Sequence, residues 1–143
     1  MYCLAFTVCI QHNIQITKLN FIIFFFLFLL ISFNSPMRLI TAALKGLLLD
    51  TFFDVVVSAE SEKLGKPYPG VYLTAATKLN VDASKCLALE DSLNGTLAAK
   101  SARMKCISIP EDYENRSKAF HIANIQLQSL EQIDDEIWKS LWG

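Results

Sequence analysis

A short apolar run that ends in two adjacent carboxylates constrains the fold of this 143-residue sequence more than any other feature. Cys86 to Leu89 carries no charge and leads directly into Glu90 and Asp91. Ser92 to Gly95 then opens an alanine-rich segment. The apolar run is typical of a centre strand covered on both faces, and the serine marks the start of a helix. Carboxylates at the carboxyl end of such a strand can hold a magnesium ion, which can hold a phosphate.

The sequence after Ser35 alternates regularly between helical and strand patterns. Helices are expected over Pro36 to Leu48, Gly70 to Leu79, Leu93 to Ala102 and Leu130 to Leu141. Strands are expected over Phe52 to Ala59, Cys86 to Leu89, Lys105 to Ile109 and Ile122 to Leu127. Strands that alternate with helices over short connections form parallel βαβ units. The fold class predicted is therefore α/β with a parallel sheet.

Two groups of residues are candidates for a phosphate site. Asp91 is the first choice for a magnesium ligand and Glu90 the second, with Ser92, Asn94 and Gly95 in support. Helix capping alone would explain the serine, and tight packing would explain the glycine. Lys66 follows Gly65 in a loop stiffened by prolines, so its ammonium group is suited to neutralising a phosphoryl group. A solvated loop lysine is the alternative interpretation.

Taken together, these motifs closely resemble those of the haloacid dehalogenase-like (HAD) hydrolases. The residues that carry the resemblance are Gly65-Lys66-Pro67-Tyr68-Pro69, Tyr72 to Ala76, Cys86 to Gly95 and Ala98 to Ala102. They look most like the phosphosugar branch, which contains hexitol and 2-deoxyglucose-6-phosphate phosphatases and β-phosphoglucomutases. The resemblance implies that Lys66 binds the phosphoryl group of a small sugar phosphate. It also implies that Glu90 and Asp91 help to hold Mg²⁺.

The same resemblance shows what this sequence lacks. Members of the family use the first aspartate of a DxD motif as nucleophile, on a first strand that lies in the middle of the sheet. No DxD occurs here, and Asp50 is followed by Asp54 at the wrong spacing. A helical cap domain is also missing, and the hydroxyl that binds phosphate has no clear equivalent, with Ser35 the nearest choice. The chain is therefore expected to be the carboxyl-terminal part of a Rossmannoid HAD core, without its first strand and cap.

The segment before Ser35 is open to several interpretations. Phe21 to Phe33 is uncharged, but a transmembrane helix needs about 20 apolar residues, and a signal peptide needs a basic start and a small-residue cleavage site. A buried strand with extra sequence attached is the third possibility. We expect residues 1–34 to lie outside the family domain, either as translated non-coding sequence or as an anchor, and residues 35–143 to form a partial core. Tyr2 to Ile10 or Phe21 to Phe33 could also fill the gap left by the first strand.

Composition narrows the partners and the location. The net charge of −1 and the absence of a basic cluster argue against nucleic-acid binding. Cys86 and Cys106 each lie near the start of a predicted strand and are expected to be reduced, buried thiols. A cytoplasmic location is expected, with membrane association through Phe21 to Phe33 as the alternative. Three functions remain: a phosphosugar phosphatase core that is inactive as written, a non-enzymatic phosphate-binding or membrane-tethered protein, and a phosphomutase of the same family.

Overall fold

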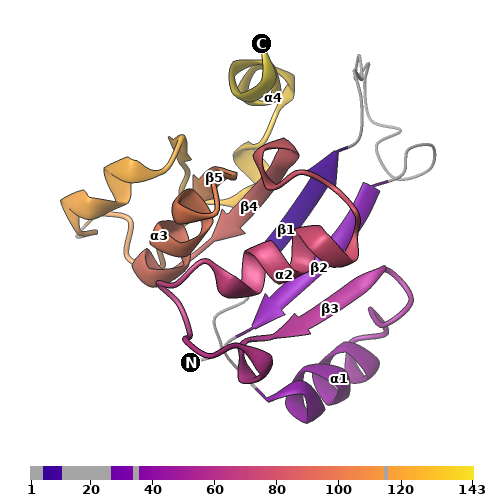
Figure 1. Cartoon of the computed structure of the whole chain (residues 1–143). Helices are drawn as coiled ribbons and strands as arrows, with labels where there is room; N and C mark the ends of the chain where they lie inside the picture. The colour runs from indigo at the N-terminus through magenta and orange to yellow at the C-terminus, as the bar shows by residue number, and fades with distance from the viewer. Residues whose placement is uncertain (1–4, 11–26, 34–35, 115) are drawn as a thin grey trace.

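The computed structural model describes residues 5–10, 27–33, 36–114 and 116–143. Within these residues, six strands form one sheet in the order β3-β2-β1-β4-β5-β6 (Figure 1). The strands are β1 (Ala5–Ile10), β2 (Leu27–Phe33), β3 (Val55–Ser58), β4 (Cys86–Glu90), β5 (Lys105–Ser108) and β6 (Ile125–Gln126). The pairs β2–β3, β4–β5 and β5–β6 are parallel. The predicted α/β fold class is confirmed.

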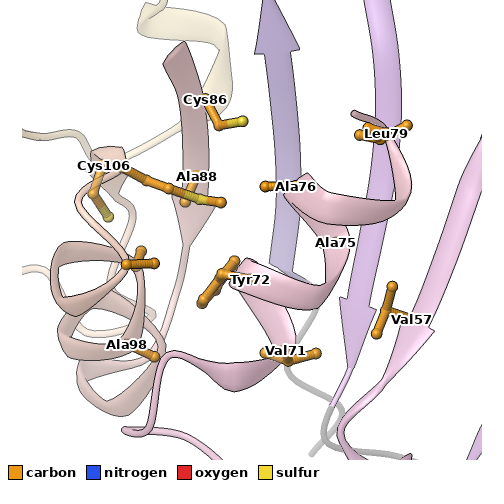
Figure 2. Close-up of a cluster of buried hydrophobic side chains, with 13 residues drawn as sticks. Val57, Val71, Tyr72, Ala75, Ala76, Leu79, Cys86, Ala88, Ala98 and Cys106 are labelled. Atoms are coloured by element: carbon orange, nitrogen blue, oxygen red, sulfur yellow. The ribbon is translucent and has the colours of Figure 1, made fainter. Parts of the chain in front are cut away.

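In the described part of the chain, four α-helices cover the two faces of the sheet: α1 (Met37–Gly46), α2 (Gly70–Lys78), α3 (Leu93–Ser101) and α4 (Asp135–Trp142). Successive residues of each strand point to opposite faces. Val57, Ala88 and Cys106 therefore share one face and belong to a single core cluster with α2 and α3 (Figure 2). The next residues along, Val56 on β3 and Leu87 on β4, face the other side, where they pack in the clusters that contain α1 and α4.

Small side chains let α2 and α3 approach the sheet closely. Ala75, Ala76, Ala98 and Ala99 are all buried in the cluster, and Tyr72 is the largest side chain among them. Figure 2 shows Tyr72 in the space between α2 and the strand–helix unit formed by β4 and α3. Because interiors are packed to crystal-like density, this one ring fills the room that the alanines leave. The two helices that flank the predicted site are thus held against the same face.

Strand β1 occupies the middle of the sheet but runs against its neighbours. It is antiparallel to β2 and to β4, with Phe6 opposite Leu89 and Ala5 opposite Ser32. The position between β2 and β4 is the one that the family resemblance assigned to the missing first strand. The described backbone therefore fills the expected gap with Ala5–Ile10, and β2 comes from the apolar run Phe21 to Phe33. The remaining strands share one direction, so their carboxyl ends meet at one edge.

Most predicted elements occur, with shifted ends. Strand β3 begins at Val55, because Phe52 still belongs to a turn in which its N–H donates to the carbonyl oxygen of Leu49 at 3.1 Å. The last predicted strand is reduced to β6, since Phe120 lies buried in the 3-10 helix η3 (Lys118–Ile122). The closing helix expected over Leu130 to Leu141 is wrong as a single element. It divides into the 3-10 helix η4 (Leu130–Gln132) and α4, because Asp134 is extended and caps α4.

The cysteines and the apolar run give two further results. Cys106 is free and buried, and burial raises the pKa of its thiol to about 12. Cys86 is disulfide-bonded, so the expectation of a reduced thiol is wrong for this residue. Strand β1, which fills the gap left by the missing first strand, places the backbone of Cys9 opposite Cys86. None of the described helices is long and apolar enough to cross a membrane.

Candidate functional site

The acidic pair lies where the predicted strand turns into the predicted helix. Strand β4 ends at Glu90, and Ser92 is the N-cap of α3. The Oγ atom of Ser92 accepts a hydrogen bond from the backbone N–H of Gly95 at 3.1 Å. This bond satisfies one of the amide groups that a helix start leaves without a partner inside the helix. The helix-capping interpretation of Ser92 is therefore confirmed, and it fixes the direction in which the chain leaves Asp91.

Glu90 is buried against the start of α3 and is only 1% exposed. Its Oε1 atom accepts a hydrogen bond from Nζ of Lys66 at 2.8 Å, and Oγ of Ser92 lies 3.4 Å from Oε2. A Cβ atom built on Gly95 would lie 1.6 Å from Oε2, so only glycine leaves room for this carboxylate. Burial raises the pKa of Glu90 to about 7, and the charge of Lys66 opposes that rise.

Lys66 reaches Glu90 from the loop that follows the 3-10 helix η1 (Ala59–Ser61). Its side chain is 1% exposed, so it is not a solvated loop lysine. Besides the carboxylate, Nζ lies 4.9 Å from the centroid of the Tyr72 ring. A cation over an aromatic face is stabilised by the ring quadrupole. The structure thus brings together the two halves of the predicted site, the lysine loop and the end of β4.

Two buried hydroxyl groups near this pair were not predicted. Ser108 pairs with Glu90 across β4 and β5, and its Oγ atom is buried without a hydrogen-bond partner among the described residues. The hydroxyl of Tyr72 is likewise buried without a hydrogen-bond partner among the described residues. Tyr72 belongs to a sequence motif noted above, but its apolar neighbours indicated only a core position. Its contact with Lys66 depends on how the loop folds back over α2, and no local pattern records that.

The other candidate residues lie apart from the ion pair. Asn94, the second residue of α3, is exposed. Asp50 is exposed in the connection that precedes β3, whereas Glu90 ends β4. Because β3 and β4 point the same way, Asp50 and Glu90 lie at opposite edges of the sheet. Ser35 lies outside the described residues.

The donors present suit magnesium in kind but are few. Mg²⁺ prefers an octahedral shell of carboxylate, water and phosphate oxygens. Glu90 and the half-buried Asp91 offer such oxygens on consecutive residues. In the described part of the chain, no group of three or more histidine, cysteine, aspartate or glutamate side chains could hold a metal ion. One oxygen of Glu90 is already engaged by Lys66, so these two residues supply only part of a shell.

Comparison with known proteins identifies the family. The sequence profile described as haloacid dehalogenase-like hydrolase matches residues 27–103, from the start of β2 to just beyond α3. Hexitol phosphatase B of Escherichia coli O157:H7 is 41% identical over 99 residues, which cover 69% of this chain and 45% of the relative. A phosphorylated carbohydrates phosphatase of Thermotoga maritima is 40% identical over 74 residues, covering 52% of this chain and 34% of the relative.

Solved structures agree with the sequence relatives. A β-phosphoglucomutase from Clostridium difficile superposes with a TM-score of 0.65 at 29% identity, over 77% of this chain and 48% of that one. The chain spans about half the length of the curated relatives that it matches, 45% and 47% for two of them. The profile match covers more than half of the sequence and includes Lys66, Glu90 and Asp91. The chain therefore belongs to the haloacid dehalogenase-like hydrolases.

Proposed function

We propose that this chain binds the phosphate group of a small phosphorylated sugar at Lys66 and does not hydrolyse it by itself. The observation that carries the proposal is the buried contact between Lys66 and Glu90 beside Asp91. A cation and two carboxylates at the carboxyl edge of parallel strands suit a phosphate bridged to a metal ion. Relatives named for hexitol phosphate and phosphorylated carbohydrates support a sugar as the organic part.

Lys66 would supply the charge that the phosphate requires. Its ammonium group already bonds to an anionic oxygen, Oε1 of Glu90, and a phosphate oxygen is an equivalent acceptor. The pair is sealed from solvent, with side-chain exposures of 1% and 0%. A ligand must therefore open the loop around Lys66 before it can bind. Tyr72, buried beneath the ammonium group, would keep the cation in place when the carboxylate is exchanged for phosphate.

Turnover would require a nucleophile that this sequence does not contain. Hydrolysis in the family, as the resemblance implies, passes through an aspartyl-phosphate. Between β2 and β4, where the resemblance expects that aspartate, the chain places the backbone of β1, with the sequence AFTVCI. No carboxylate occurs in this strand. Binding without hydrolysis is therefore the activity that the strand order favours.

Glu90 and Asp91 would hold a magnesium ion, with water and phosphate completing its shell. The positive charge of the ion would offset the repulsion between the two carboxylates and the negatively charged phosphate. With only two protein carboxylates, one of them paired to Lys66, we expect binding to be weak without a phosphate ligand. Magnesium and phosphate should accordingly bind cooperatively.

Titration calorimetry of the whole chain tests the proposal. Inorganic phosphate and a hexitol phosphate would be titrated with and without Mg²⁺, alongside a colorimetric assay for released phosphate. Lys66→Met should abolish binding. Lys63→Met, which changes an exposed lysine of the same loop, is the matched control and should leave binding unchanged. Binding that Lys66→Met does not alter would refute the role of Lys66. If the native chain released phosphate and Asp91→Asn did not, the chain would be an active hydrolase and the proposal of binding without hydrolysis would be wrong.

A second candidate is a complete phosphatase or phosphomutase in which a longer product supplies the nucleophile. The observation in its favour is that the chain spans only 45% of the hexitol phosphatase that it resembles. Sequencing the 5′ end of the transcript distinguishes the two candidates. A reading frame that continues upstream into a DxD strand and a helical cap would establish the longer product. A transcript without such a frame would leave phosphate binding as the function.

A further inference from the structure

A second glutamate, outside the acidic pair, lies at the base of the loop that carries Lys66. Glu62 follows η1 directly and is half-buried. Its backbone N–H donates to the carbonyl oxygen of Ala59 at 3.1 Å, which fixes the residue to the end of β3 and η1. The hydroxyl of Thr74, on α2, donates to Oε1 of Glu62 at 2.7 Å. This bond connects the segment before the lysine loop with the helix after it.

The other carboxylate oxygen of Glu62 lies against the first residue of α2. A Cβ atom built on Gly70 would lie 2.5 Å from Oε2, so the glutamate occupies the space that a side chain would fill. Helix α2 has Pro69 as its N-cap, with no side-chain cap and no acidic residue in its first turn. A carboxylate placed here supplies the negative charge that a helix N-terminus favours. Two interactions therefore stabilise Glu62 at this position: the hydrogen bond from Thr74 and the favourable charge at the N-terminus of α2.

These contacts close the loop on both sides of Lys66. Residues 63–69 lie between Glu62 and Gly70, and Tyr68 N–H donates to the carbonyl oxygen of Gly65 at 3.0 Å within them. Fixing the two ends of a short loop removes most of its conformational freedom. Lys66 can then be held on Oε1 of Glu90 at 2.8 Å at a smaller cost in chain entropy. Three residues of α2 take part: Thr74 binds Glu62, Gly70 leaves room for its carboxylate, and Tyr72 lies beneath the ammonium group.

We propose that Glu62 is a positioning residue for Lys66: by accepting a hydrogen bond from Thr74 and packing against Gly70, it closes the lysine loop so that the ammonium group lies at the end of β4. The positioning itself is a property of the chain without ligand. Its consequence for phosphate affinity rests on the function proposed above.

The rate at which Lys66 is acetylated tests this directly. The intact chain would be treated with a small acetylating reagent, and each lysine would be followed by mass spectrometry. In the native chain the buried Lys66 should react far more slowly than the exposed Lys63 and Lys78. Glu62→Ala should speed the reaction at Lys66 by about tenfold, the factor that corresponds to losing one charged hydrogen bond. Glu62→Gln, whose amide oxygen can still accept from Thr74, should stay close to the native rate.

Two further variants reach the same contact from the helix side. Thr74→Val removes the donor, and its control is Thr77→Val, which changes an exposed threonine of the same helix. Gly70→Ala places a methyl group where Oε2 lies, and should push the flexible glutamate aside without breaking α2. Alanine normally favours a helix over glycine. A faster reaction at Lys66 in this variant would therefore run against helix propensity and support the displacement of Glu62.

The half-buried Lys100 serves as an internal reference, because it is held on α3 by the carbonyl oxygen of Met104 and by Asn124. Faster reaction at Lys66 alone supports the proposal. Native rates at Lys66 in the folded variants Glu62→Ala, Thr74→Val and Gly70→Ala would overturn it, and so would an equal increase at Lys100, since that indicates general loosening. Inorganic phosphate added to the native chain gives a separate result. If phosphate does not protect Lys66, the proposed function fails while the positioning role of Glu62 stands.

Discussion

The Nζ atom of Lys66 lies 2.8 Å from the Oε1 atom of Glu90, and both side chains are sealed from solvent. The two residues are 24 positions apart, one in the loop after β3 and the other at the end of β4. The contact lies at the carboxyl end of β4 and joins the two sequence motifs that indicate phosphate chemistry. Because the same two residues form the candidate site and a buried ion pair, changes to them should alter both ligand binding and the free energy of unfolding.

Replacing Lys66 by methionine should destabilise the fold. Removing one partner of a buried ion pair leaves the other charge without compensation, and we expect a loss of about 2–4 kcal/mol at pH 8. The loss should be smaller at pH 5, where Glu90 can remain protonated. Urea unfolding at the two pH values measures both quantities. The double variant Lys66→Met/Glu90→Gln is the control and should be more stable than Lys66→Met, and equal stability of the two would contradict the pairing.

The stability of the native chain should decrease as pH rises from about 4.5 to 7 through the contribution of Glu90, whose pKa burial raises from 4.5 to about 7. In this window the folded state keeps a proton that the unfolded state has released, so raising the pH favours unfolding. The glutamine in Glu90→Gln does not titrate, so this variant lacks the pH-dependent contribution of Glu90. Its stability relative to the native chain should therefore increase by about 1–3 kcal/mol between pH 5 and pH 8, at about 1.4 kcal/mol per pKa unit. Parallel stability curves for the two proteins would show that Glu90 has an ordinary pKa.

Replacing Gly95 by alanine should destabilise the protein even though alanine favours helices. The added methyl carbon would lie 1.6 Å from Oε2 of Glu90, and that carboxylate is buried and held by Lys66. We expect a cost of about 2–4 kcal/mol, typical of overpacking that also disturbs a buried polar contact. Thermal unfolding measures it. Gly46→Ala is the matched control, since nothing lies within 4 Å of the new methyl group there, and it should be neutral or stabilising. A Gly95→Ala protein as stable as the native one would mean that Glu90 lies elsewhere.

Replacing Asp134 by alanine should weaken α4 selectively. Its Oδ1 atom accepts hydrogen bonds from the backbone N–H groups of Glu136 at 3.0 Å and Ile137 at 2.8 Å. Loss of such an N-cap costs about 1 kcal/mol, and Asp134→Asn should recover most of it. Both tryptophans of the sequence, Trp138 and Trp142, lie in α4, so their fluorescence reports on this helix during urea unfolding. An unchanged fluorescence midpoint in Asp134→Ala would contradict the capping role.

Elements with strong local signals could be predicted from sequence almost to the residue. Helix α2 begins at Gly70 as predicted, because the preceding Pro69 cannot continue a strand and an apolar stripe follows. Strand β4 was predicted to within one residue from its uncharged run. The closing helix failed because Leu130 and Leu141 fit one helical period, whereas Asp134 interrupts it with an extended backbone. A periodic pattern does not record where a polar residue leaves the helix to cap the next one.

The direction and pairing of β1 could not be predicted in the same way. Side chains alternate between the two faces of any strand, whether its neighbours run parallel or antiparallel. The sequence of Ala5–Ile10 therefore contains no signal for its antiparallel place between β2 and β4. That place is also what brings Cys9 opposite Cys86.

The sequence by itself determined the α/β order of elements, the buried centre strand and the strand-to-helix junction that carries Glu90 and Asp91, because each depends on neighbours within one turn or one strand. Only the tertiary structure decided that Lys66 is sealed against Glu90, that Tyr72 lies beneath it, and that Gly95 must leave room for the carboxylate. These relationships join residues from separate elements. They arise from how the loop after β3 closes over α2 and meets the end of β4, which is a property of packing in three dimensions and has no periodic trace along the chain.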